Sequence, residues 1–170
     1  ALWVEDVSVA DASSSERSVV DRLSLAVRSG EIVCIYGLMG AGRTELLECI
    51  AGRLQPSGGR ILLEGNDISR LGIAERIARG LVLVPEDRQR DGLVQTMSVG
   101  ANLSLASIGS FVRGMFLSRS QERSLVEASI RDVHVKTAGG SAPIGALSGG
   151  NQQKVVIGKM LTTHPKVMLL

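Results

Sequence analysis

The stretch Gly37-Leu38-Met39-Gly40-Ala41-Gly42-Arg43-Thr44 carries the strongest signal for the fold. Its spacing is G-x-x-x-x-G-[K/R]-[S/T], and it lies between an apolar run that predicts a strand and a pattern that predicts a helix, which is the context of a phosphate-binding loop. Glycines let backbone N–H groups turn inward around a phosphate, and the N-terminus of the helix adds the positive end of its dipole. We expect this loop to bind phosphate, with the Thr44 hydroxyl on Mg²⁺.

Arg43 departs from the usual form of this loop, which has lysine at that position. Arginine keeps the positive charge but replaces a compact ammonium group with a broad planar guanidinium. We therefore expect the loop still to bind an anion. The charge alone does not predict that Arg43 is correctly placed against a phosphoryl group that is being transferred. The alternative is a glycine-rich turn that binds no ligand.

Strand and helix patterns alternate on both sides of this loop. Strands are predicted over 2–9, 23–27, 31–36, 60–64, 81–84 and 167–170, with Trp3 and Tyr36 in the core and a polar loop from Asp11 to Arg17. Helices are predicted over 43–51, from Ile73 to Gly80, over 98–106 and 118–135, and after the glycines at 149–150. The alternation favours an α/β core, with a mainly helical insertion at about 87–146.

Length and composition describe an ordinary folded domain. The 170 residues are 44% hydrophobic and 21% charged, which excludes disorder and collagen-like structure and suits about one domain. The net charge of +2, with scattered Lys and Arg and few aromatic residues, argues against a nucleic-acid partner. No apolar run approaches the ~18 residues of a membrane span, so the chain is expected to be soluble.

A second anion-binding pattern follows about a hundred residues later, at Leu147-Ser148-Gly149-Gly150-Asn151-Gln152-Gln153. Ser148 and the two glycines would leave hydroxyl and backbone donors exposed at the start of a helix. The stretch resembles the LSGGQ-type signature of ATP-binding cassette (ABC) proteins, with Asn151 in place of the usual glutamine. Taken alone it could be only a loop and a helix cap, but a phosphate loop upstream makes that coincidence improbable.

The resemblance extends over essentially the whole chain. GLMGAGRTEL (37–46), VPEDRQRDGL (84–93) and LSGGNQQKV (147–155) are together similar to the second nucleotide-binding domain of bacterial monosaccharide importers of the ribose, xylose and galactose type. In that family two cassettes are fused, and the second tends to carry the arginine form of the loop. The implied fold is an α/β P-loop NTPase of the ABC type. A core with a β subdomain would occupy 1–86 and 147–170, and a helical subdomain 87–146.

The resemblance also implies two nucleotide contacts. The phosphates of the domain's own ATP would be bound by Gly37, Gly40, Ala41, Gly42, Arg43 and Thr44, with Mg²⁺ at Thr44. Cassettes work as face-to-face pairs, so the signature would contact the γ-phosphate of ATP held by the partner cassette, through Leu147, Ser148, Gly149, Gly150 and Asn151.

Glu86 stands where the family's Q-loop has a glutamine that senses Mg²⁺ and the attacking water. A carboxylate could ligate Mg²⁺, which makes Glu86 a further cofactor and metal candidate, but it cannot donate as an amide does. The run Asp87–Asp91 could equally be a solvated charged surface. The segment Asp11–Val20 contains no aromatic residue to stack on adenine, a contact worth ~1–3 kcal/mol.

The two ends suggest a piece of a longer chain. The sequence begins with Ala1, and Val167-Met168-Leu169-Leu170 resembles the strand that leads into the Walker B aspartate and the catalytic glutamate, neither of which follows. The core sheet would then be incomplete at the C-terminus. No catalytic residue is assigned within the chain, and loss of a general base costs ~10²–10⁴-fold in rate. We expect the parent protein, rather than this piece alone, to hydrolyse ATP.

These patterns predict an ATP-binding piece of a sugar importer that donates its signature to a partner cassette. A transmembrane permease and, indirectly, a sugar-binding protein would be its other partners, at the cytoplasmic face of the bacterial inner membrane. The alternatives are a regulatory or soluble ABC module outside transport and a small-molecule kinase. A kinase would not need the signature, and a DNA-repair cassette would carry a long coiled coil, whereas 87–146 shows no heptads.

Overall fold

The computed structural model describes residues 1–11, 14–113 and 116–170. Its contacts divide the chain into two compact units. Unit 1 is Ala1–Leu83 with Lys166–Leu169, and unit 2 is Val84–Pro165 with Leu170. The phosphate loop therefore lies in unit 1, and the signature lies in unit 2.

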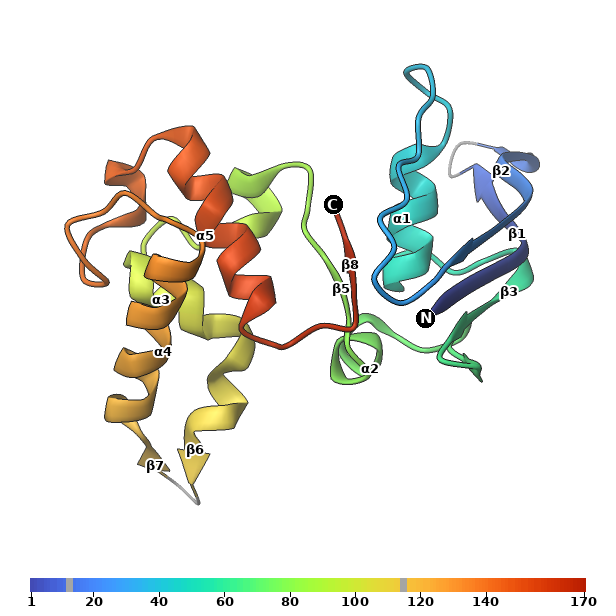
Figure 1. Cartoon of the computed structure of the whole chain (residues 1–170). Helices are drawn as coiled ribbons and strands as arrows, with labels where there is room; N and C mark the ends of the chain where they lie inside the picture. Colours follow the sequence, from blue (N-terminus) through green and yellow to red (C-terminus); the bar gives the residue numbers. More distant parts are fainter. Residues whose placement is uncertain (12–13, 114–115) are drawn as a thin grey trace. The chain divides into compact units, whose positions relative to one another are not determined.

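Unit 1 contains an antiparallel sheet of four strands in the order β2-β1-β3-β4 (Figure 1). The strands are β1 (Leu2–Asp11), β2 (Ser14–Val27), β3 (Gly58–Leu63) and β4 (Asn66–Asp67). Positions 12–13 of the expected polar loop lie outside the described residues. From Ser14 the chain is already in β2 and paired with β1, so the expectation of a loop up to Arg17 is wrong there.

β1 buries core residues in both of its halves although the alternation is broken between them. Val4 and Val7 are both buried although they are three positions apart, whereas regular alternation has a period of two. The register against β2 shifts between these two residues, and Asp6 has a φ of 48° in the left-handed region. This bulge keeps both halves of the strand on the core. Trp3, expected in the core, is instead 40% exposed.

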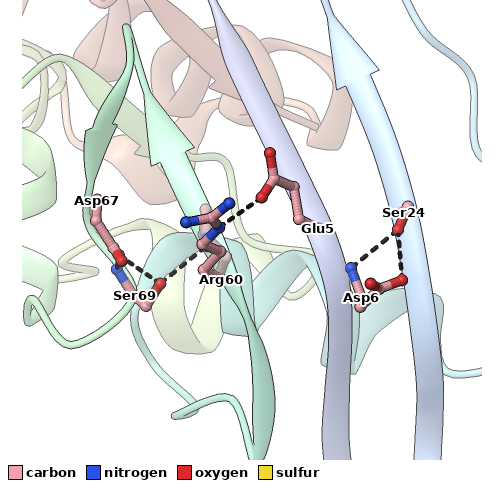
Figure 2. Close-up of polar contacts among 7 residues, drawn as sticks. Glu5, Asp6, Ser24, Arg60, Asp67 and Ser69 are labelled. Carbon is pink, nitrogen blue, oxygen red and sulfur yellow. Dashed lines mark hydrogen bonds and ion pairs between the residues drawn. The ribbon is translucent and has the colours of Figure 1, made fainter.

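Polar contacts between neighbouring strands hold the other face of this sheet (Figure 2). Arg60 Nε of β3 donates to Glu5 Oε2 of β1 at 2.5 Å. The Ser24 hydroxyl of β2 accepts from the Asp6 backbone N–H at 2.9 Å and donates to Asp6 Oδ1 at 3.1 Å. These pairs fix β1 between its neighbours and satisfy the backbone N–H at the bulge.

The turn after β4 is held by Asp67 (Figure 2). Its Oδ1 accepts from the Ser69 backbone N–H at 2.8 Å and from the Ser69 hydroxyl at 2.6 Å, and these bonds lower the pKa of the Asp67 carboxyl. The same hydroxyl oxygen accepts from the backbone N–H of Ile61 in β3. The turn is therefore tied back to the sheet.

The core of unit 1 lies between this sheet and α1 (Arg43–Ala51), the helix that follows the phosphate loop. Leu46, Cys49 and Ile50 are buried in it, as their helical spacing predicts. The core also takes in the parallel strands β5 (Leu81–Leu83) and β8 (Val167–Leu169). The short helix α2 (Ile73–Ala78) precedes β5.

The C-terminus of α1 is held by a fully buried arginine, Arg76 of α2. Its Nη1 donates to the carbonyls of Cys49 at 2.8 Å and Ile50 at 2.7 Å, its Nη2 to Ser69 at 2.7 Å and its Nε to Leu71 at 2.9 Å. The carbonyl end of a helix attracts a positive charge, and its last carbonyls lack partners within the helix. The far end of the phosphate-loop helix is thus fixed to the turn between β4 and α2.

The predicted buried strand over 31–36 does not form. Ile32 is 97% exposed and Tyr36 is 92% exposed, so the expectation that Tyr36 lies in the core is also wrong. A strand needs a neighbour to take up its N–H and C=O groups. In the described part of the chain nothing pairs with this segment as a strand, and β5 and β8 pair only with each other.

Unit 2 is mainly helical, as the sequence predicts for 87–146. Its largest helices are α4 (Arg119–Asp132) and α5 (Gly149–Leu161), close to the predicted positions. Between them and before them lie η1 (Arg88–Gly92), α3 (Val99–Ser104), η2 (Leu105–Phe111), β6 (Val112–Arg113), β7 (Phe116–Leu117) and η3 (Ile144–Ala146).

In unit 2, α5 packs against α3 and α4. Val155 and Val156 are buried, and the Cβ-free Gly158 lets Leu103 of α3 approach closely. By its contacts α5 therefore groups with the helices, although the sequence reading assigns 147–170 to the core. The predicted division into a core at 1–86 and 147–170 and a helical subdomain at 87–146 stays a prediction.

Within residues 1–11, 14–113 and 116–170, none of the helices combines the length and the apolar character needed to cross a bilayer.

Candidate functional site

The phosphate loop of unit 1 has the backbone that an anion cradle needs. Gly40 and Gly42 have φ values of 80° and 78°, in the left-handed region that favours glycine. The Ala41 N–H donates to the Leu38 carbonyl at 3.1 Å, which closes a tight turn before α1 begins at Arg43. Gly42 is the N-cap and has no side chain to accept the first N–H groups of the helix. Those groups point toward the place where a phosphate would bind.

Gly42 is required for space as well as for conformation. A Cβ at this position would lie 2.7 Å from the Val19 carbonyl oxygen and 3.1 Å from a Val20 methyl group of β2. At Gly40, by contrast, no described atom lies within 4 Å of an added Cβ. The loop is therefore anchored on the sheet at its last glycine and open at the middle one.

Arg43 and Thr44 are both exposed at the start of α1. The Arg43 side chain bends back across the loop, since its Cδ lies 3.6 Å from an ideal Cβ on Gly37. This brings the arginine stem over the loop that the sequence predicts to hold phosphate. Ala41 is exposed in the turn itself. The six predicted phosphate-loop residues, at 37 and 40–44, are therefore all in one short segment of unit 1.

The predicted Mg²⁺ ligands Thr44 and Glu86 lie in different units. Both are exposed, and both offer the hard oxygen donors that Mg²⁺ prefers. Among the described residues no group of three or more His, Cys, Asp or Glu side chains could hold a metal ion. Mg²⁺ binding at Thr44 and Glu86 therefore stays a prediction.

The charged run after Glu86 is not a uniformly solvated surface. Asp87 caps η1, because its Oδ1 accepts from the backbone N–H groups of Gln89 at 2.9 Å and Arg90 at 3.1 Å. Gln89 and Arg90 are exposed, but Arg88 is mostly buried. The solvated-surface alternative therefore holds for part of the run and is wrong for Arg88.

The signature begins α5 in unit 2. Ser148 is the N-cap, Gly149 is the first helical residue, and Gly150 is exposed after it. The Ser148 hydroxyl does not cap the helix. Its oxygen instead accepts from Asn151 Nδ2 at 3.0 Å, which leaves the hydroxyl proton to be donated outward. Leu147 is half-buried and anchors the turn that precedes the helix.

Asn151, which replaces the usual glutamine, is held on both sides. Its Oδ1 accepts from the backbone N–H of Lys136 at 2.9 Å, so its amide nitrogen must face Ser148. Sequence reasoning missed Lys136, because a backbone donor from a distant loop leaves no residue-type signal.

A second contact missed by sequence reasoning joins Arg88 to the signature. Arg88 Nη2 lies 2.7 Å from the position of a Cβ on Gly149. The two residues are far apart in sequence, and the charged run around Arg88 predicts exposure rather than burial. Nothing in the spacing could have paired them.

Two relatives show what this chain is similar to. The xylose import ATP-binding protein XylG of Ralstonia nicotianae is 40% identical over 99% of this chain, which covers 33% of that protein. The ribose import ATP-binding protein RbsA of Rhodopirellula baltica is 43% identical over 99% of the chain and is covered to the same 33%. The chain therefore spans about a third of the length of these relatives.

The solved structures it resembles are cassettes. A dimeric, post-hydrolysis form of the ATP-binding cassette MJ0796 with ADP and phosphate matches 99% of the chain and 72% of its own, with a TM-score of 0.83 at 20% identity. A nucleotide-free cassette from an ABC transporter matches 98% of this chain and 66% of its own, with a TM-score of 0.78 at 25% identity. The first likeness supports the fold alone. A family model described as ABC transporter matches residues 20–170, and the chain therefore belongs to the ABC transporter family.

Proposed function

We propose that this chain binds ATP with Mg²⁺ at its phosphate loop and donates its signature to ATP held by a partner cassette, within a monosaccharide importer. Two observations support the direction of this proposal: the relatives named above are import ATP-binding proteins for xylose and ribose, and they match nearly the whole chain. The observation that carries it is the backbone that leads into α1, where Gly40 and Gly42 turn with positive φ, the N-cap Gly42 brings no side chain to the start of the helix, and the exposed Arg43 follows.

At the phosphate loop, the chain's own groups bind and orient the β- and γ-phosphates. Backbone N–H groups and the helix dipole attract the anion, and the Arg43 guanidinium adds a charge-assisted contact. Arginine presents a planar fork, so it suits two phosphate oxygens at once. Thr44 and, separately, Glu86 are the candidate ligands of Mg²⁺, which would neutralise phosphate charge when bound.

At the signature, Ser148 would donate its hydroxyl to the γ-phosphate of the partner's nucleotide. Asn151 occupies the serine oxygen from the other side, which directs the proton away from the protein. Gly149 and Gly150 add backbone N–H donors at the start of α5. These groups stabilise charge without transferring a proton.

The partners implied by this role are a second cassette, a transmembrane permease and, indirectly, a sugar-binding protein. The chain would work as a peripheral protein at the cytoplasmic face of the bacterial inner membrane. Its position on the permease would transmit closure of the two cassettes around ATP.

Nucleotide binding by this chain tests the first half of the proposal. Equilibrium dialysis with ATP and Mg²⁺ should show binding that Arg43→Met weakens by about 10- to 150-fold, because a hydrogen bond to a charged group contributes ~1.5–3 kcal/mol. Arg70→Met, which removes an exposed arginine elsewhere in unit 1, is the matched control. Equal affinities for the two variants would refute the phosphate-loop role.

Sugar uptake tests the second half. In the importer assembled with its permease, Ser148→Ala should lower ATP hydrolysis and uptake together, while Ser141→Ala, at another exposed serine of unit 2, should lower neither. Unchanged rates for Ser148→Ala would reject donation of the signature and would favour a regulatory module.

A further inference from the structure

Arg88 is held in a way that is unusual for a cation. Its Nε is fully buried and has no hydrogen-bond partner in the structure. Among the ion pairs between described residues, none includes this guanidinium. Buried polar groups are nearly always paired in folded proteins, so an unpaired one at a candidate site calls for an explanation.

The guanidinium is packed against the first glycine of the signature. Arg88 Nη2 lies 2.7 Å, Cζ 3.4 Å and Nε 3.9 Å from the place where a Cβ on Gly149 would stand. Any side chain at this position would displace the arginine. Gly149 therefore leaves room for the guanidinium where it stands, and its φ does not lie in the left-handed region.

Two further contacts fix the η1 turn along α5. A Cβ on Gly92, the last residue of η1, would lie 3.0 Å from a Val156 methyl group of α5. Lys159 Nζ, one turn further along α5, donates to the Gly92 carbonyl. With Arg88 on Gly149 at the other end, the turn is attached to α5 at both of its ends. The backbone that carries Arg88 is thus held against α5.

The electrostatics of this position oppose a cation when no anion is present. The N-terminus of α5 is the positive end of its dipole, and its first turn contains no acidic residue to offset an added positive charge. The first turn of α5 therefore offers no opposite charge to the guanidinium at Gly149. An anion beside Ser148 would satisfy both the arginine and the helix.

We infer that Arg88 is a further residue of the signature site, supplying a fixed positive charge, beside the Ser148 hydroxyl, to the phosphate of the nucleotide that the partner cassette holds. This inference rests on the proposed function of the signature. It assigns to the segment after Glu86 a role in the partner's nucleotide site, in addition to any contact of Glu86 with Mg²⁺.

The importer assembled with its permease provides the test. Arg88→Met keeps the apolar stem and removes the charge, so we expect kcat/KM for ATP to fall at least tenfold. Arg88→Lys should restore activity to within about threefold of the unmodified protein. Arg90→Met, which removes an exposed arginine from the same turn, should change nothing.

Thermal unfolding separates this role from a structural one. A structural arginine lowers Tm when it is replaced, whereas Arg88→Met should leave Tm unchanged or raise it, because the charge has no partner in the free chain. A lowered Tm with unchanged kinetics would overturn the inference. A loss of activity that Arg88→Lys fails to restore would overturn it as well.

A double-mutant cycle tests the contact itself. Gly149→Ala displaces the guanidinium, so the losses for Gly149→Ala and Arg88→Met should be less than additive when combined. Full additivity would contradict the inference. If both Arg88→Met and Ser148→Ala leave kcat/KM for ATP unchanged, the proposed function has failed. If Ser148→Ala lowers it and Arg88→Met does not, only this inference has failed.

Discussion

Replacement of Arg76 by methionine should destabilise unit 1 more than any surface change. Arg76 is fully buried, and its guanidinium donates to four backbone carbonyls, two of which end α1. No carboxylate pairs with it among the ion pairs of the described residues. Burial lowers the pKa of the guanidinium, which shows that the charge is held at a desolvation cost. Methionine fills most of the volume but donates nothing.

The size of the effect follows from those carbonyls. The Cys49 carbonyl keeps a partner without the arginine, because it also accepts from the Gly52 N–H at 3.1 Å. A buried acceptor left without a partner costs ~1–3 kcal/mol, so the carbonyls of Ile50 and Ser69 cost about 2–6 kcal/mol together. Removing the guanidinium also relieves its desolvation, which offsets part of this cost. We expect a net loss of about 2 kcal/mol in the free energy of unfolding, well above the ~0.5 kcal/mol of a typical surface change.

Trp3 makes the measurement specific. It is the single tryptophan of the chain and lies in β1, so its fluorescence during urea unfolding reports on unit 1 alone. Arg79→Met is the control, because Arg79 is exposed and its side chain reaches only the Glu75 carbonyl at 3.2 Å. An Arg76→Met protein within about 0.5 kcal/mol of the control would show that the four bonds contribute no net stability, and the reasoning would fail.

Three further substitutions have definite expected outcomes. Ser69→Ala should raise the pKa of Asp67 toward its usual value of about 3.9, as measured by NMR titration, because it removes the hydroxyl bond to Oδ1, the largest cause of the lowered pKa, and leaves the backbone N–H bond in place. Acid stability that is lost as the pH falls through the native pKa should then be lost at a higher pH. Burial lowers the pKa of Lys159 in the native protein, so between that pKa and the usual value of about 10.4 the unfolded chain binds more protons than the folded one. The free energy of unfolding therefore rises with pH in this alkaline range, and Lys159→Met should remove the rise. Gly52→Ala should cost more than about 1 kcal/mol in urea unfolding, since Gly52 has a φ of 85° and an added Cβ would lie 2.9 Å from the buried arginine.

Local patterns predicted the parts of the fold that local interactions determine. The helix after the phosphate loop begins at Arg43 and stops at Gly52, as its glycines and apolar spacing indicate. The helix of the signature also begins where the sequence predicts it. Both have a buried face that neighbouring residues supply, and α1 also ends in a glycine C-cap at Gly52.

The strand predicted over 31–36 failed for a reason outside the segment. Its residues have the apolar, β-branched character of a buried strand, but a strand forms only beside a partner. Hydrophobic character shows what a segment can bury, whereas pairing depends on which strands reach it. The bulge at Asp6 was missed in a similar way, because a single shift in register leaves the composition of β1 unchanged.

The site was predicted by motif and completed by contacts that no motif contains. Ser148 and its glycines were found from their spacing, but the direction of the Ser148 hydroxyl depends on Asn151, which the Lys136 backbone holds in place. Arg88 was read as part of a charged run because the sequence shows its charge and not its burial. Contacts between distant segments have no periodicity, so residue spacing alone does not reveal them.

The glycines of the two motifs are therefore not equivalent, although a motif writes them with the same letter. Gly40 has a positive φ and open space around it, so alanine there would meet backbone strain alone. Gly42 has a positive φ and also touches β2, so both constraints act together. Gly149 has neither the positive φ nor a backbone neighbour at close range; an arginine side chain is what occupies the space. The two motifs thus use glycine to bend the chain, to seat it on the sheet, and to leave room for the Arg88 side chain, and only the third use links the signature to a residue outside it.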